Sequence, residues 1–212
     1  MFKQNIYKKI DILLNRCDSP HRNHTVGVYY PADSGKCLRR TFFKYKFGAS
    51  SDMKGRAKGR ILTSTILENL CLDVLQSMGY AIKVKISKRV GEIEIRGEVD
   101  AINSEEVVEV KTVTPTAMRK TPFKADLAQL NTYMWLADRQ KGAIIYVKSD
   151  NPSIIHVCPA RFNKDLLDTT ITRIQALHEH LKNNKIPPKT DSPNACKNCM
   201  FKAICSYIDG LS

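Results

Sequence analysis

Apolar residues recur along this chain at two spacings, and their order predicts alternating helices and strands. Helical patterns cover residues 1–16, 37–46, 55–78, 124–138 and 161–184. Alternating or short apolar runs predict strands at about 81–88, 92–102, 106–113, 142–148 and 154–158. In the first strand, Ile82, Val84 and Ile86 are expected to share one face, and Gly79 is expected to end the preceding helix. This order predicts an α/β fold with a mixed sheet flanked by helices.

Two acids and a lysine stand at neighbouring strand ends in this pattern. Asp100 ends the second predicted strand, and the third carries Glu109 and Lys111, which alternation places on one face. Two carboxylates can hold a hard divalent cation, and a nearby lysine can meet a developing negative charge. The pattern therefore indicates a metal-dependent phosphodiesterase. The alternative is a solvent-facing charge pair beside an ordinary turn aspartate.

The helix predicted after these strands carries two further polar residues on one face. Gln129 and Tyr133 are four residues apart, so their side chains are neighbours on the helix surface. Both residue types are common on exposed helix faces. The pair therefore indicates a site only in combination with the acids and the lysine.

Length and composition place the chain among ordinary globular proteins. Its 212 residues can bury one sizeable core with a small satellite, and 42% apolar and 26% charged residues are typical of that class. No apolar run approaches the roughly 20 residues of a membrane span, and the N-terminus lacks the apolar core of a signal peptide. We therefore expect a cytoplasmic protein.

Positive charge is concentrated in the first 60 residues. They hold 14 Lys and Arg against 4 Asp and Glu, which is +10 of the total formal charge of +13. Such a field favours a polyanionic partner such as nucleic acid. Phe42, Phe43, Tyr45 and Phe47 are interleaved with these cations, and they either stack on unpaired bases or pack into the core.

Seven cysteines, an odd number without a secretion signal, argue against a disulfide framework. Cys196, Cys199 and Cys205 form a Cys-x2-Cys-x5-Cys run near the C-terminus. Three thiolates this close can converge on a metal centre, but a closed site usually takes a fourth ligand. Cys37 is the first candidate for that ligand and Cys17 the second. Four thiolates suit either zinc or an iron–sulfur cluster.

Together these motifs carry a resemblance. From about Cys37 to Cys205 the chain resembles the RecB-like branch of the PD-(D/E)XK nucleases. More narrowly, it resembles the iron–sulfur exonucleases of the CRISPR adaptation machinery (Cas-four) and their viral relatives. The resemblance implies a restriction-endonuclease-like mixed sheet. It also implies three segments: a basic helical one at 1–60 that contributes one cluster ligand, a nuclease core at 61–184 and a Cys-rich one at 185–212.

The resemblance also implies roles for individual residues. Asp100 and Glu109 would bind Mg²⁺ or Mn²⁺ with the carbonyl of Val110, and Lys111 would orient the attacking water and stabilise charge in the transition state. Gln129 and Tyr133 would position Lys111 or the DNA backbone. A [4Fe–4S] cluster would be held by four cysteines: Cys37, Cys196, Cys199 and Cys205. The implied substrates are DNA, with single-stranded ends favoured. The implied partners are CRISPR integration proteins.

One departure from the family pattern concerns the helix before the sheet. Residues 59–64 contain no histidine where these nucleases usually carry a metal-binding one. Glu68 is the substitute ligand, or else a surface residue. Two rival functions share parts of the pattern: a non-catalytic nucleic-acid-binding protein with a structural zinc or iron–sulfur site, and a restriction-type endonuclease.

Overall fold

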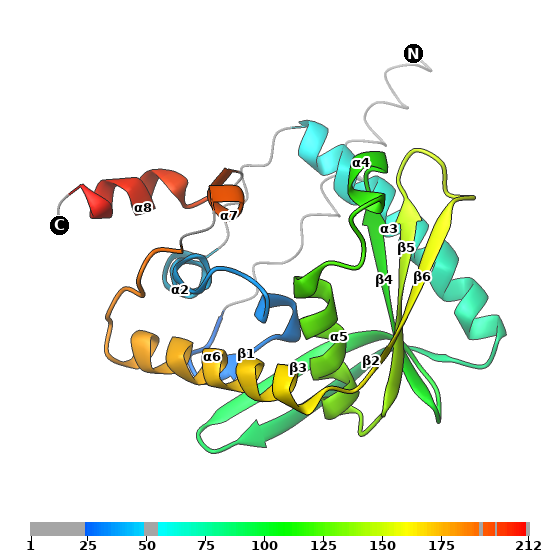
Figure 1. The fold of residues 1–212 in the computed structure, drawn as a ribbon, viewed down its shortest axis with the longest axis horizontal. Coiled ribbons are helices and arrows are strands. Elements are labelled where there is room, and N and C mark those ends of the chain that lie inside the picture. Colours follow the sequence, from blue (N-terminus) through cyan, green and yellow to red (C-terminus); the bar gives the residue numbers. More distant parts are fainter. Residues whose placement is uncertain (1–23, 49–54, 191–192, 198, 211–212) are drawn as a thin grey trace, which may run out of the picture.

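A computed structural model describes residues 24–48, 55–190, 193–197 and 199–210, and a six-stranded mixed sheet lies at its centre (Figure 1). Its strands are β1 (Val28–Tyr29), β2 (Ala81–Val90), β3 (Ile93–Ile102), β4 (Glu106–Val113), β5 (Lys141–Lys148) and β6 (Ile155–Arg161). The five strands predicted from alternation are thus confirmed, although β6 runs further than expected. The predicted helix at 1–16 and Cys17 lie outside the described residues.

The pairing of the strands gives the order β1-β3-β4-β5-β6, with β2 on β3 as well. The β1–β3 and β4–β5 pairs are parallel, and the β2–β3, β3–β4 and β5–β6 pairs are antiparallel. The predicted mixed sheet is therefore confirmed.

Helices cover both faces of this sheet (Figure 1). The helical elements are η1 (Pro31–Asp33), α2 (Leu38–Phe47), α3 (Gly55–Ser77), α4 (Pro115–Met118), α5 (Lys124–Leu136), α6 (Lys164–Lys182), α7 (Pro193–Lys197) and α8 (Lys202–Asp209). On one face, Leu67 and Leu75 of α3 pack with Val108 of β4. On the other, Leu130 of α5 packs with Ile144 of β5 in a larger core that α2 and α6 extend. As predicted, Gly79 ends α3, with a φ of 90°.

One edge of β3 opens at its middle. Strand β2 pairs with β3 along the other edge, from Ile93 to Ile102. The edge of β3 opposite β2 is divided between two strands. Strand β1 pairs there at Glu94 and Ile95, and β4 pairs only at Ala101 and Ile102. Strands β3 and β4 therefore diverge on the N-terminal side of Ala101, from Asp100 back toward Ile95, and the β3 backbone between the two short pairings is free to receive side chains.

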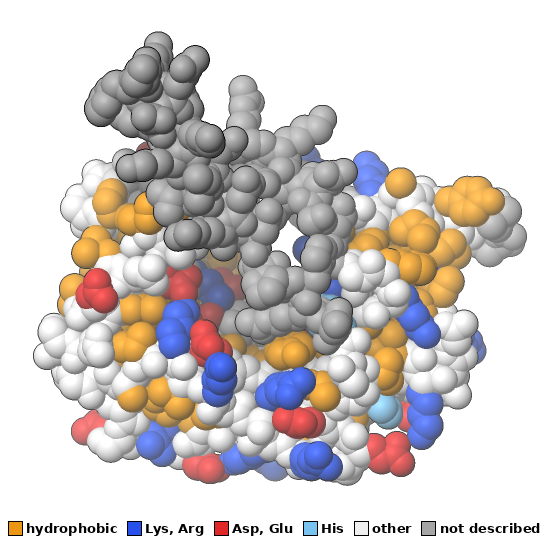
Figure 2. All heavy atoms as spheres, turned by 180° about the vertical axis from the view of Figure 1, so that it is seen from behind, with side chains coloured by type: hydrophobic (Ala, Val, Ile, Leu, Met, Phe, Trp, Pro, Cys, Tyr) orange, Lys and Arg blue, Asp and Glu red, His pale blue; other side chains and the backbone are white. Residues whose placement is uncertain are grey.

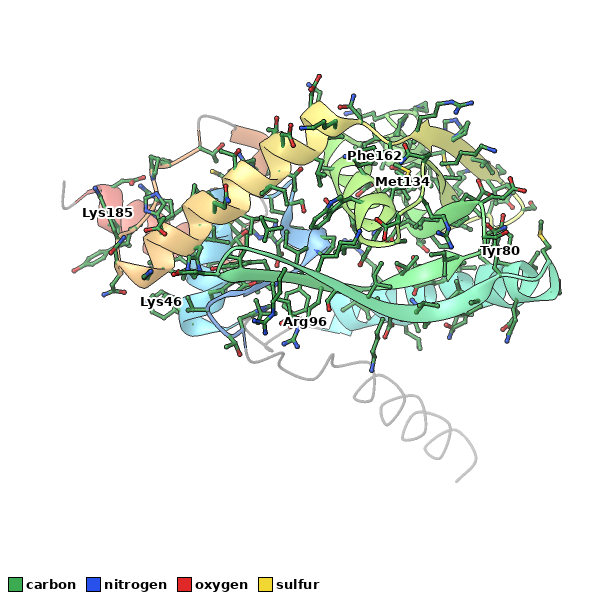
Figure 3. All side chains as sticks on the ribbon, turned by 90° about the horizontal axis from the view of Figure 1, so that it is seen from below. Lys46, Tyr80, Arg96, Met134, Phe162 and Lys185 are labelled. Carbon is green, nitrogen blue, oxygen red and sulfur yellow. The ribbon has the colours of Figure 1, made fainter. Side chains whose placement is uncertain are left out.

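The expectation that Ile82, Val84 and Ile86 share one face is wrong. Ile82 packs in the core beneath α3, whereas Ile86 packs in the core on the other side of the sheet. The physical reason lies between them, because Lys83 has a left-handed φ of 53° and turns the strand. Figure 3 shows the long β2–β3 ribbon bending along the molecule, with Tyr80 near one end and Arg96 toward the other.

Helix α2 lies near the C-terminal helices α7 and α8 (Figure 1). Phe43 of α2 is buried and meets Phe201, with ring centroids 5.8 Å apart. Of the four aromatics named from the sequence, only Phe47 is exposed, so the other three pack into the core. Figure 2 shows basic and acidic side chains interspersed over the face seen from behind. Within the described part of the chain, no helix is both long and apolar enough to cross a membrane.

Candidate active site

Asp100 lies where β3 and β4 separate, and its carboxylate bridges the gap. Its Oδ2 accepts a hydrogen bond of 2.8 Å from the backbone N–H of Val110, replacing a rung of the strand ladder. Its Oδ1 accepts a bond of 2.7 Å from Nζ of Lys83. The residue as a whole is 7% exposed, so both oxygens are committed in a protein environment rather than in water.

Glu109, Lys111 and Gln129 form a closed ring of contacts next to Asp100. As strand alternation predicts, Glu109 and Lys111 share a face, and Nζ of Lys111 lies 2.5 Å from Oε1 of Glu109. Gln129 reaches them from α5, where Nε2 donates to that same Oε1 at 2.7 Å and Oε1 accepts from Lys111 at 3.1 Å. One amide thus fixes the acid and the lysine together, because its donor and acceptor ends are both used.

Charge in this ring is set by burial and by neighbours. Burial raises the pKa of Glu109, and the nearby Lys111 opposes that shift only in part. For Lys111, burial acts against the charged form, but Glu109, Asp126 and Asp100 outweigh it and leave the pKa of the lysine above its usual value. Lys111 therefore stays cationic, and a further positive neighbour beside Glu109 would favour the ionised carboxylate against the effect of burial.

The second carboxylate oxygen of Glu109 indicates where a further cation would bind. Oε2 of Glu109 is buried and has no hydrogen-bond partner among the described residues. A buried carboxylate oxygen without a partner is costly, and a hard cation coordinated by oxygen would satisfy it. The donor set of Asp100, Glu109 and the Val110 backbone, all of oxygen, therefore fits a divalent ion such as Mg²⁺ or Mn²⁺.

Glu68 of α3 is joined to the site through Lys83, a residue that no sequence pattern indicated. Nζ of Lys83 contacts Oε1 of Glu68 as well as Oδ1 of Asp100, so one ammonium group bridges the two acids. Burial disfavours its charge, but the hydrogen bonds that Lys83 donates to Asp100 and Glu68 outweigh burial and raise the pKa of the lysine. A left-handed lysine within a strand has no sequence signature, which explains why the pattern missed it.

Tyr133 packs in the core beside the hydrogen-bonded group of Glu109, Lys111 and Gln129. It is 5% exposed and lies in the main core one helical turn beyond Gln129. Its ring covers Gly97 so closely that a Cβ on Gly97 would come within 2.7 Å of Cε1. The expected roles of Gln129 and Tyr133 in positioning Lys111 remain predictions, and Gln129 accepts a hydrogen bond from Lys111.

The four cysteines predicted as cluster ligands come together from the two ends of the chain. Cys37 before α2 and Cys196, Cys199 and Cys205 around α7 and α8 all line one cavity of about 120 Å³. All four are free thiols. This set of soft sulfur donors fits zinc or an iron–sulfur cluster. Among the described residues, no three His, Cys, Asp or Glu side chains are close enough to hold a metal ion as they stand.

Arg39 ties this cysteine cavity to the rest of the fold. Its guanidinium donates to the carbonyl of Pro187 at 2.7 Å, to Oδ1 of Asp209 at 2.5 Å and to Sγ of Cys205 at 3.4 Å. Arg39 is 8% exposed. Hydrogen bonds to a thiolate sulfur are one way in which a protein adjusts a bound metal centre.

Most of the chain matches a known protein family. Residues 36–206 match the PD-(D/E)XK nuclease superfamily, which covers most of the chain and both groups of residues described above. The chain belongs to the PD-(D/E)XK nuclease superfamily. Asp100, Glu109 and Lys111 thus lie within the matched region of a nuclease.

Individual relatives of this PD-(D/E)XK chain are distant but span nearly its whole length. A CRISPR-associated exonuclease Cas4 from Saccharolobus solfataricus is 23% identical, with 92% of this chain and 96% of that protein covered. The crystal structure of SSO0001 has the same fold at a TM-score of 0.68 and 23% identity, covering 92% and 95% of the two chains. An alkaline exonuclease from Laribacter hongkongensis shares the fold at a TM-score of 0.57 and 12% identity, covering 88% and 96%.

Proposed function

We propose that this chain is a Mg²⁺- or Mn²⁺-dependent deoxyribonuclease that removes nucleotides from DNA ends, with single-stranded ends favoured. The observation that carries the proposal is the buried, unpartnered Oε2 of Glu109 among the described residues, next to Asp100 and the cationic Lys111. Membership of a nuclease superfamily and the exonuclease names of two relatives support it.

The acids and one backbone carbonyl supply the oxygen ligands in this proposal. Asp100, Glu109 and the carbonyl of Val110 would hold the divalent ion, with Glu68 as the further acid from α3. When bound, such an ion polarises the phosphate and makes a water molecule more acidic. The backbone N–H of Val110 orients the Asp100 carboxylate, so the ligands are held before substrate arrives.

Lys111 supplies the positive charge that phosphodiester cleavage requires. Hydrolysis gathers negative charge on the phosphate oxygens, and a fixed ammonium in a water-poor site stabilises that charge more than a mobile one would. Gln129 and Glu109 hold Lys111 from two sides and prevent its ammonium from swinging into solvent. Tyr133 supports this arrangement from the core by fixing α5 against β3.

The proposed function also includes a structural metal centre in the cysteine cavity. Cys37, Cys196, Cys199 and Cys205 would hold a [4Fe–4S] cluster that joins α2 to the C-terminal helices. Their free thiols around one cavity support this assignment, and the same donors would also accept zinc. Such a centre would shape the surface that DNA follows.

The biological role proposed is CRISPR adaptation, and hence antiviral defence, together with integration proteins. The name of the Cas4 relative supports it. The alternative role is viral DNA recombination or end processing, which would use the same chemistry.

A degradation assay on end-labelled linear and circular single-stranded DNA tests the enzyme. We expect Mn²⁺-dependent loss of linear DNA only, and at least about a 100-fold lower rate for Lys111→Ala. Lys141→Ala is the matched control, because Lys141 lies on the neighbouring strand five pairings away, roughly 17 Å along the sheet. Equal rates for wild type and Lys111→Ala would refute the assignment, and DNA binding without any cleavage would favour a non-catalytic binding protein.

A further inference from the structure

Lys83 occupies an unusual place in the sheet. Strand β2 pairs with β3 residue by residue, but Lys83 and the opposing Asp100 are missing from that register, between the Ile82–Ala101 and Val84–Val99 pairs. At this position Lys83 has a φ of 53°, a left-handed conformation that is unfavourable for a residue with a Cβ. A strained residue in a strand needs a compensating interaction.

That interaction is a cation placed between two acids. Nζ of Lys83 lies 2.7 Å from Oδ1 of Asp100 and also contacts Oε1 of Glu68. The Asp100 side chain is 9% exposed, whereas those of Glu68 and Lys83 are 32% and 35% exposed. The ammonium therefore lies at the border between solvent and the buried acid, where a small cation could reach the same oxygens.

Lys83 and a divalent ion would compete for the same oxygen of Asp100. Oδ2 is held by the Val110 N–H, so Oδ1 is the oxygen through which Asp100 would meet an ion from the side of Glu68. Lys83 already binds that oxygen. A divalent ion that recruits both Asp100 and Glu68 must displace the ammonium or share the two acids with it, and two like charges a few ångströms apart repel.

We propose that Lys83 is a resident cation of this acidic site, which competes with divalent metal for Asp100 and Glu68 and thereby sets how much metal the protein needs. This inference rests on the proposed function, because it takes the metal to bind at Asp100 and Glu109. Lys83 is a positioning residue here. It keeps the acids together while metal is absent, and it raises the metal concentration at which they exchange partners.

Replacement of Lys83 by asparagine isolates the charge from the backbone strain. Asparagine tolerates a left-handed φ better than most residues, so Lys83→Asn removes the ammonium while the turn in β2 is kept. Lys85→Asn is the matched control, since Lys85 is an exposed lysine on the same strand. Glu109→Gln reports separately on the metal site itself.

Binding of Mn²⁺ alone, measured by calorimetry on protein freed of divalent ions, tests the proposal. We expect Lys83→Asn to bind Mn²⁺ about tenfold more tightly than wild type, Lys85→Asn to match wild type, and Glu109→Gln to lose binding. Equal or weaker binding by Lys83→Asn overturns the role of Lys83, whatever the other variants do. Retained binding by Glu109→Gln instead overturns the metal site of the proposed function.

Thermal unfolding gives a second readout that does not depend on catalysis. Without metal, Lys83→Asn leaves Glu68 and Asp100 facing each other without their cation, so its Tm should fall below that of wild type. Added Mn²⁺ should then raise the Tm of Lys83→Asn more than that of wild type, since ligand binding stabilises the folded state. A Tm increase no larger than that of wild type would contradict the competition.

Discussion

The contact between Gly97 and Tyr133 makes a sharp test of how the site is supported. A methyl group added by Gly97→Ala would lie 2.7 Å from Cε1 and 2.9 Å from Oη of Tyr133, and 3.2 Å from Cδ of Pro31. Carbon atoms normally approach to about 3.5–4.0 Å, so the tyrosine ring would have to retreat by roughly 1 Å. The ring is buried and cannot swing into solvent.

This overlap sets the expected size of the effect. Overpacking a filled core costs about 1–3 kcal/mol, and the reduced freedom of alanine in the unfolded chain returns about 0.4–1 kcal/mol. We therefore expect Gly97→Ala to lower the free energy of unfolding by about 1–2 kcal/mol. Activity should fall as well, because Tyr133 lies one turn from Gln129 on α5. A shift of the Tyr133 side chain would move Gln129 and so disturb its hydrogen bond with Lys111.

Urea unfolding followed by circular dichroism measures this change, with Gly59→Ala as the matched control. A Cβ at Gly59 in α3 would meet nothing within 4 Å, and alanine is the better helix former, so this variant should gain about 0.5–1 kcal/mol. The two glycine substitutions should thus have opposite signs. A Gly97→Ala protein as stable as wild type would refute the close packing of Tyr133 on β3.

Three further outcomes follow from the contacts described above. Gln129→Leu removes two hydrogen bonds to charged groups, so kcat in the single-stranded DNA assay should fall by about 100-fold, and an unchanged kcat would contradict the positioning role. Arg39→Met breaks three contacts in the C-terminal region and should cost roughly 3 kcal/mol in urea unfolding, whereas a loss under 1 kcal/mol would show that they are dispensable. The purified protein should be brown with broad absorbance near ~400 nm, and Cys37→Ser should reduce that absorbance, while a colourless protein with one equivalent of zinc would overturn the cluster.

Much of the fold could be predicted because its main elements carry strong local patterns. The strands from β2 to β6 and the helices α2, α3, α5 and α6 appear close to their predicted ranges. The short elements β1, η1, α4, α7 and α8 were not predicted, because segments of two to eight residues hold too little periodicity to identify. Such elements depend on partners elsewhere, as β1 does on Glu94 and Ile95 of β3.

The sequence by itself determined which side chains of the site share a face within a single strand or helix. Strand alternation placed Glu109 and Lys111 on one face, and helical spacing placed Gln129 and Tyr133 on one face of α5. These are local consequences of backbone geometry, which every residue in a regular strand or helix obeys. The family resemblance needed no more than those local facts and the spacing of the cysteines.

Only the tertiary structure decided which groups from distant segments meet. The divergence of β3 and β4 lets Val110 donate to Asp100, and the left-handed turn at Lys83 brings its ammonium between Glu68 and Asp100. The packing of α2 against the C-terminal segment brings Cys37 to the same cavity as Cys205. These contacts depend on where a strand bends and where a ladder ends, and those features are set by packing across the whole core rather than by neighbouring residues.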